Sequence, residues 1–184
     1  AINYIAAKPK NAFEAGADIS YGRFNQVDGT AYVTGPITEG LNARLAVSGL
    51  RADAWQKSTI SDRKNGKQEW FAGRFLLDWE AGDNLRFALN VNGWIDNSQP
   101  QAQQLVAIRS QVPSNASPEL LNYPFPANNN RAADWSEGLQ KSRREFYQFG
   151  LRGDLDLTDS ISLTSLTSYS HFTQDQAIDA DGMA

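Results

Sequence analysis

Apolar and polar residues alternate with a period of two over residues 70–79 and again over residues 85–95. A period of two is typical of a β-strand, because successive side chains point to opposite faces of a sheet. The polar sequence Ala81-Gly82-Asp83-Asn84 joins the two stretches and favours a tight turn. The pattern therefore predicts a β-hairpin. One of its faces is almost wholly apolar, and the other carries arginine, aspartate and asparagine.

The same alternation recurs along most of the chain. It predicts strands over residues 13–22, 27–37, 41–50 and 147–157, a less regular strand over 161–172, and a short apolar strand over 1–7. The connections near Glu39, Gly82 and Asp159 are short. At the other end of the strands, the connection near Asn25 is short, whereas residues 57–68 and 97–143 form long loops rich in polar residues. One or two helical turns are expected within the second long loop, over residues 102–111.

A sheet with one apolar and one polar face fits two environments. It is either a soluble sheet with one hydrated face or part of a membrane barrel with lipid outside. Short turns at one end and long loops at the other are typical of outer-membrane barrels. Aromatic residues add to this, because Trp79 and Phe13 lie at the short-turn end and Tyr21, Phe71 and Tyr147 at the long-loop end. The eight steps from Phe71 to Trp79 span roughly 21 Å at a ~40° tilt, near the ~25 Å apolar band of such barrels.

Composition narrows the remaining classes. The chain has 184 residues, a net charge of -4 and a mean hydropathy of -0.50. It lacks the run of about 18 apolar residues that a transmembrane helix needs. Mild acidity and the lack of a basic stripe argue against nucleic acid as a partner. The chain contains no cysteine, so disulfides and thiolate metal sites are excluded.

No catalytic constellation stands out in the sequence. Ser170 precedes the single histidine, His171, but neighbours on a strand point to opposite faces and cannot form a nucleophile and base pair. Asp154 and Asp156 share a face with Arg152, as expected for a hydrated wall. The sequence therefore predicts no enzyme, no catalytic residue, no metal site and no cofactor.

Several segments are similar to one known family. Residues 1–9, Ala-Ile-Asn-Tyr-Ile-Ala-Ala-Lys-Pro, resemble the last plug strand of TonB-dependent outer-membrane receptors, usually written as glycines followed by A-I-N-x-x-x-x-K-P. Residues 16–24 look like the first barrel strand of these receptors. Residues 33–37 and 41–50 are similar to the second and third strands, and residues 163–169 are similar to a recurring strand of the same barrels.

The resemblance implies an all-β fold, an antiparallel up-and-down transmembrane β-barrel with long extracellular loops. Residues 1–10 would end the plug domain, and residues 11–184 would form the N-terminal part of the barrel. The family builds its barrel from 22 strands, and about seven are expected here. Seven is an odd number, whereas single-chain bacterial barrels close with an even one. We therefore expect a fragment, with most of the plug and the TonB box before Ala1 and most of the barrel after Ala184.

The function that the resemblance implies is energised uptake of a scarce nutrient across the bacterial outer membrane. A ferric siderophore is the commonest cargo; cobalamin, haem and oligosaccharides stay open. The implied partners are TonB with its inner-membrane energising complex, reached through the missing plug region, outer-membrane lipid, and the small-molecule ligand. Two other classes stay open: a passive outer-membrane porin, and a soluble β-sheet module for binding or adhesion.

Two sets of residues are candidates for the site. Aromatic and cationic residues of the long loop suit an aromatic, anionic ligand, or else they only pack the loop together; they are Tyr123, Phe125, Arg131 and Trp135. Polar residues facing the lumen are expected to contact the plug or one another, or else to line a substrate path; they are Arg44, Arg74, Asp78, Arg86, Asn90, Asn92, Arg152 and Asp154.

Overall fold

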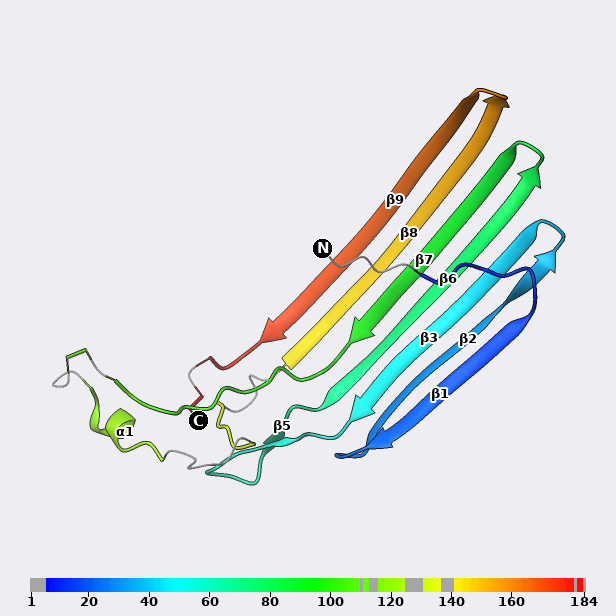
Figure 1. Cartoon of the computed structure of the whole chain (residues 1–184). Helices are drawn as coiled ribbons and strands as arrows, with labels where there is room; N and C mark the ends of the chain where they lie inside the picture. Colours follow the sequence, from blue (N-terminus) through cyan, green and yellow to red (C-terminus); the bar gives the residue numbers. More distant parts are fainter. Residues whose placement is uncertain are drawn as a thin grey trace.

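The main element of the computed structural model is one seven-stranded antiparallel sheet, in which strands adjacent in the chain are also adjacent in space (Figure 1). The model describes residues 6–109, 111–112, 116–124, 131–136, 141–180 and 182–183. The strands of the sheet are β1 (Glu14–Gly22), β2 (Gln26–Thr38), β3 (Leu41–Ala52), β6 (Gln68–Gly82), β7 (Leu85–Asp96), β8 (Lys141–Thr158) and β9 (Ile161–Ala177). The predicted all-β fold with seven antiparallel strands is confirmed. The sheet is open, with β1 and β9 at its edges, and does not close into a barrel.

The connections are sorted by length between the two ends of the sheet, as the sequence predicts (Figure 1). Residues 39–40, 83–84 and 159–160 make tight turns at one end. Residues 23–25, 53–67 and 97–140 connect the strands at the other end. A register shift of one residue precedes each tight turn, between Pro36 and Thr38, Glu80 and Gly82, and Asp156 and Thr158. Such bulges increase the local twist, which helps a two-residue turn to join twisted strands.

The strand register gathers most of the apolar side chains of the seven strands on one face. Val91 of β7 lies opposite Phe75 of β6 on one side and Phe149 of β8 on the other. The row continues in both directions and holds, in order from β1, Ala15, Val33, Leu45, Phe75, Val91, Phe149 and Tyr169. We call this side of the sheet the apolar face and the opposite side the polar face.

No second layer covers the apolar face within the described residues. Val91 and Phe149, at the middle of the face, are 38% and 40% exposed, and Ile19 of β1 is 82% exposed. The buried hydrophobic residues of the described chain lie elsewhere, at the end of β3 and in the loops; they are Ala52, Ala102, Ala132, Ala133 and Trp135. In a soluble β-sandwich, the residues of the apolar face, such as Val91 and Phe149, would be the buried ones. The sheet therefore exposes an apolar surface that extends over all seven of its strands.

The structure corrects some local expectations. The helical turns expected over residues 102–111 are wrong, because residues 102–109 are irregular and the described helix is α1 (Pro118–Leu121). The Ala102 N–H donates to Oε1 of Gln56 at 2.8 Å, and the Ala102 carbonyl accepts from Nε2 of Gln56 at 2.9 Å. Residues 6–7 belong to no strand, and residues 1–5 lie outside the described residues. The first long loop contains an unpredicted two-stranded ribbon, β4 (Gln56–Lys57) and β5 (Lys64–Asn65). In the described ranges, no helix is long and apolar enough to cross a membrane.

Candidate functional site

Residues 6–13, the described part of the N-terminal segment, run across the polar face of the sheet (Figure 1). The backbone N–H of Lys10 donates to Oγ1 of Thr34 at 3.0 Å. Thr34, only 2% exposed, donates in turn to the carbonyl of Ala43 at 2.9 Å. Ala6 and Ala7 border a cavity of about 150 Å³ together with side chains of β3 and β6. The polar face is therefore the side of the sheet on which the N-terminal segment rests.

Two of the predicted lumen residues, Arg44 and Arg74, lie close to this segment. Arg44 places its guanidinium 4.1 Å from the centre of the Tyr32 ring. Arg44 and Arg74 both border the cavity beside the N-terminal segment. None of the described contacts joins Asp78 to this segment. Arg44 and Arg74 thus lie beside the residues before the first strand, and contact of the whole set with the plug stays a prediction.

Apart from Asp78, the other predicted lumen residues contact one another or their neighbours on the polar face. Arg86 pairs with Asp156 at 3.0 Å. Arg152 pairs with Asp154 at 2.7 Å, and Thr164 donates to the same carboxylate at 2.7 Å. Nδ2 of Asn92 donates to the side-chain oxygens of Gln148 and Asn90, at 3.1 Å and 3.3 Å. The structure thus brings all eight predicted residues to one face, and a role in a substrate path stays a prediction.

The loops at the far end from the tight turns pack on one another. Ala102, Ala133 and Trp135 form a small buried cluster. The buried carboxylate of Asp134 accepts hydrogen bonds from the hydroxyls of Ser58 and Thr59 and from the Thr59 N–H, the last at 3.1 Å. These bonds join the second long loop to the first. Because a buried carboxylate is costly without partners, this network fixes the two loops together.

The predicted loop residues take part in this packing. Trp135 is 5% exposed, and the guanidinium of Arg63 lies 5.5 Å from its ring centre. Nε of Arg131 donates to the Trp55 carbonyl at 2.9 Å, and its guanidinium lies 4.7 Å from the ring centre of Phe24. The half-buried Tyr123 donates its backbone N–H to Leu120 at the end of α1. Phe125 lies outside the described residues. For Arg131 and Trp135, the observed contacts are those of loop packing, and ligand binding stays a prediction.

A ladder of aromatic rings on the polar face escaped the sequence analysis. Trp94 of β7, Phe146 of β8 and Phe172 of β9 lie opposite one another in the register. The ring centres of Trp94 and Phe146 are 6.2 Å apart, and those of Trp94 and Phe172 are 6.0 Å apart. The signal was present in the sequence, because all three occupy the positions that alternate with the apolar ones. Large rings on a polar face are the informative exceptions to the pattern.

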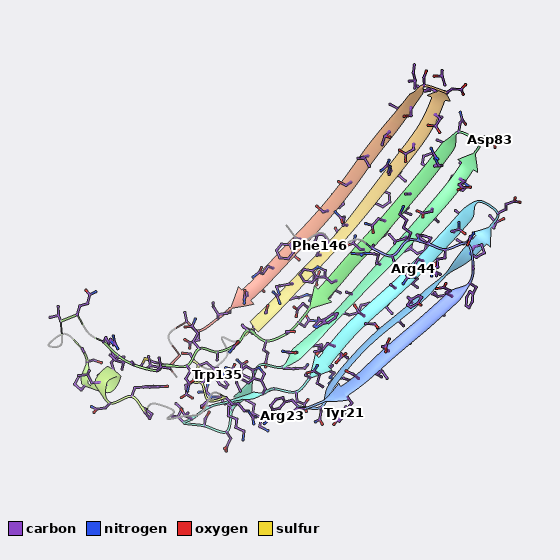
Figure 2. All side chains as sticks on the ribbon, in the orientation of Figure 1. Tyr21, Arg23, Arg44, Asp83, Trp135 and Phe146 are labelled. Carbon is purple, nitrogen blue, oxygen red and sulfur yellow. The ribbon has the colours of Figure 1, made fainter. Side chains whose placement is uncertain are left out.

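A shallow depression of about 450 Å³ lies beside this ladder on the polar face. It extends from Tyr32 and Ser48 to Trp94, and the side chains of Arg44 and Arg74 line it. Figure 2 labels Arg44 of β3, which lines the depression, and Phe146 of β8, which belongs to the ladder. The depression, the two arginines and the ladder form the part of the described chain best suited to hold a small molecule.

No three histidine, cysteine, aspartate or glutamate side chains gather to hold a metal ion in the ranges that the structure covers. The ring of His171 stacks on Tyr147 of the apolar face, with ring centres 5.0 Å apart, and Ser170 points to the opposite face.

Comparison of the chain with protein-family models and with curated proteins finds no match.

Proposed function

We propose that this chain forms part of the wall of a TonB-dependent outer-membrane transporter, with the end of its plug. The observation that carries the proposal is the uncovered apolar face, which continues across all seven strands and is backed by a polar face. In water such a surface is a liability, because soluble monomers rarely expose apolar patches beyond a few hundred Å². In a bilayer the same surface faces acyl chains, and the polar face lines the interior.

The height of the apolar face supports a membrane setting. On β8 the outward positions run from Tyr147 to Leu157, ten steps along the strand. At ~3.4 Å per residue and a tilt of ~40° they span roughly 26 Å, close to the ~25 Å apolar band of outer-membrane barrels. Beyond Tyr147, the same face of β8 carries the ion pair of Arg143 with Glu145. Charges thus begin where the hydrocarbon layer would end.

The N-terminal segment favours a plugged transporter over an open porin. It rests on the polar face, where the plug of a receptor would lie, and it is fixed there through the buried Thr34. Within this proposal, a plug coupled to TonB and its inner-membrane complex drives the uptake of a scarce nutrient. A ferric siderophore is the commonest cargo that the resemblance implies. The soluble-module alternative requires a layer over the apolar face, and the described residues supply none.

Cysteine accessibility tests the proposal directly, because the chain has no cysteine of its own. Val91→Cys places a thiol on the apolar face, and Asn92→Cys places one on the polar face one residue later. In intact cells and isolated outer membranes, a charged maleimide should label Asn92→Cys and spare Val91→Cys. After extraction and denaturation, both variants should label equally. The parental protein gives the background labelling.

Three results would contradict the proposal in whole or in part. Equal labelling of the two thiols before denaturation would mean that both faces are hydrated, as in a soluble sheet. Recovery of the intact protein in the soluble fraction, without detergent, would exclude the membrane setting altogether. If uptake persists at the same rate without TonB, the barrel assignment still holds, but the energised step is contradicted. That result would favour a passive porin.

A further inference from the structure

The N-terminal segment leaves the polar face at the tight-turn end of the sheet and turns into β1 (Figure 1). Lys10 still lies on the polar face, where its backbone bonds to Thr34. Phe13 continues the alternation of β1 outward, next to Gly35 of β2, and is 75% exposed. The chain therefore changes faces between Lys10 and Phe13, immediately before β1 begins.

One buried hydroxyl joins the segment to the sheet just before this change of face. Oγ1 of Thr34 accepts from the Lys10 N–H at 3.0 Å and donates to the Ala43 carbonyl at 2.9 Å. In the register, Thr34 lies opposite Glu14 of β1 and Arg44 of β3. Thr34 is 2% exposed, so water has little access to these bonds, which strengthens them. The Lys10 backbone is thus attached to the first three strands through a single residue.

The side chain of Lys10 adds a second, weaker attachment. Its Nζ lies 2.7 Å from Oε1 and 2.8 Å from Oε2 of Glu14, the first residue of β1. Both side chains are about half exposed, at 51% and 41%, and exposed ion pairs contribute little to stability. The buried bond to Thr34 is therefore the principal attachment of the segment.

The residues before Lys10 are attached less firmly. Among the described residues, no hydrogen bond joins residues 6–9 to the sheet, and Pro9 has no N–H to donate. Ala6 and Ala7 border the cavity of about 150 Å³ beside β3 and β6. The attachment thus changes at Lys10, from loose contact before it to a buried hydrogen bond.

We propose that Lys10 and Thr34 form a mechanical stop at the junction of plug and barrel. A pull on the chain before Lys10 releases the residues up to Pro9, and the sheet then bears the load through Thr34. The pairing of β1 with β2 survives, because the load reaches Lys10 before it reaches Glu14. The stop therefore separates the part of the chain that moves from the wall that stays. This inference rests on the proposed function, since the plug must be pulled for the stop to bear a load.

Single-molecule force spectroscopy tests the stop on the complete protein in lipid bilayers, gripped at the N-terminus of its plug. The released length grows by ~3.3–3.6 Å for each residue. In the parental protein, the last force peak before β1 detaches should fall where the chain is free up to Pro9. In Thr34→Val this peak should be lost, and release should continue to Glu14, which adds residues 10–13 or roughly 13–14 Å.

Amide hydrogen exchange of the same protein gives a second readout, without force. The Lys10 N–H should exchange about twofold to tenfold faster in Thr34→Val, the effect of losing one hydrogen bond. Thr34→Ser keeps the hydroxyl and should match the parent in both readouts. Thr30→Val is the matched control, because Thr30 is an exposed residue on the same face of β2. It should change neither the last force peak nor the exchange of Lys10.

Three outcomes overturn the stop. They are a parental force peak at a position other than Lys10, equal released lengths for Thr34→Val and the parent, and a Thr30→Val effect as large as that of Thr34→Val. The labelling of Val91→Cys and Asn92→Cys is measured in the same bilayers. If the labelling pattern holds and the force peak does not, the barrel wall stands and the stop falls. If the labelling pattern fails, the proposed function falls independently of the force result.

Discussion

A single arginine on the apolar face should destabilise the folded protein strongly, whereas its neighbour on the polar face should tolerate the same change. Val91 lies midway between Phe87 and Ile95 on β7, and it faces outward between Phe75 and Phe149. Its position therefore corresponds to the middle of the proposed membrane layer. Asn90, one residue earlier, faces the polar side and makes one side-chain hydrogen bond, at 3.3 Å.

The expected magnitudes differ because the two environments differ. Arginine on the lipid face of a barrel costs about 2–4 kcal/mol at the bilayer midplane. Val91→Arg should therefore lower the folding equilibrium constant by roughly 30-fold to 900-fold. Asn90→Arg should cost about 0.5–1 kcal/mol, the loss of one weak hydrogen bond on a hydrated face. Val91→Arg would also destabilise a soluble protein in which Val91 is buried in a core. The unfolding is therefore measured in lipid vesicles.

The assay is guanidinium unfolding of the intact protein from phosphatidylcholine vesicles, followed by tryptophan fluorescence. The denaturation midpoints of the two variants and the parent are compared at equal slope. A second arginine substitution at the membrane boundary, Ile95→Arg, tests the dependence on depth. Its cost in folding free energy should fall toward about 0–1 kcal/mol. Equal costs for Val91→Arg and Asn90→Arg, or no dependence on depth, would refute the lipid-facing assignment.

Two further predictions concern the ends of the sheet. Gly40 has φ +70° in a tight turn, and a Cβ there would lie 3.1 Å from the Glu80 carbonyl oxygen, so Gly40→Val should lower stability by about 1–3 kcal/mol in the same unfolding assay. Gly82→Ala is its control, since nothing lies within 4 Å of a Cβ there, and an equal loss would contradict the reasoning. Arg131→Ala removes the bond to Trp55 and the stacking on Phe24, so limited proteolysis should cut residues 53–67 several-fold faster than in the parent. The exposed Lys141→Ala should leave that rate unchanged, and no difference between the two variants would count against loop locking.

Alternation predicted the strands where one face is apolar and failed where both faces are polar. β8 begins at Lys141 and β9 ends at Ala177, well beyond the predicted bounds at residues 147 and 172. In these extensions Arg143 lies opposite Asp175, so the pairing of β8 with β9 continues where polar side chains replace the apolar ones. Hydrogen bonding to a neighbouring strand decides the strand length there, and a single strand's sequence does not contain that information.

The candidate site was predictable by face and unpredictable by contact. The alternation alone placed all eight lumen residues, including Arg44 and Asp154, on the polar face. The pairing of Asp154 with Arg152, two residues away on the same strand, was within reach of the sequence. The contacts of Arg86 with Asp156 and of Arg44 with the Tyr32 ring were not, because they depend on the register between different strands. The loop residues were harder still. Trp135 contacts the Arg63 side chain and Arg131 bonds to the Trp55 backbone carbonyl, both in another loop, and no local pattern predicts such contacts.

The two edge strands of the sheet, β1 and β9, need pairing partners if the apolar face meets lipid. The outer edges of β1 and β9 present unpaired backbone groups, which in water invite aggregation and in a bilayer cost several kcal/mol for each unsatisfied group. A lipid-facing sheet is therefore stable only when its edges are paired, and antiparallel sheets achieve this by closing on themselves. If the apolar face meets lipid, then further strands must pair with β1 and with β9. Amide hydrogen exchange along β9 of the intact, detergent-solubilised protein tests this requirement, because its outward N–H groups should exchange slowly if a further strand pairs with them and rapidly if they are free.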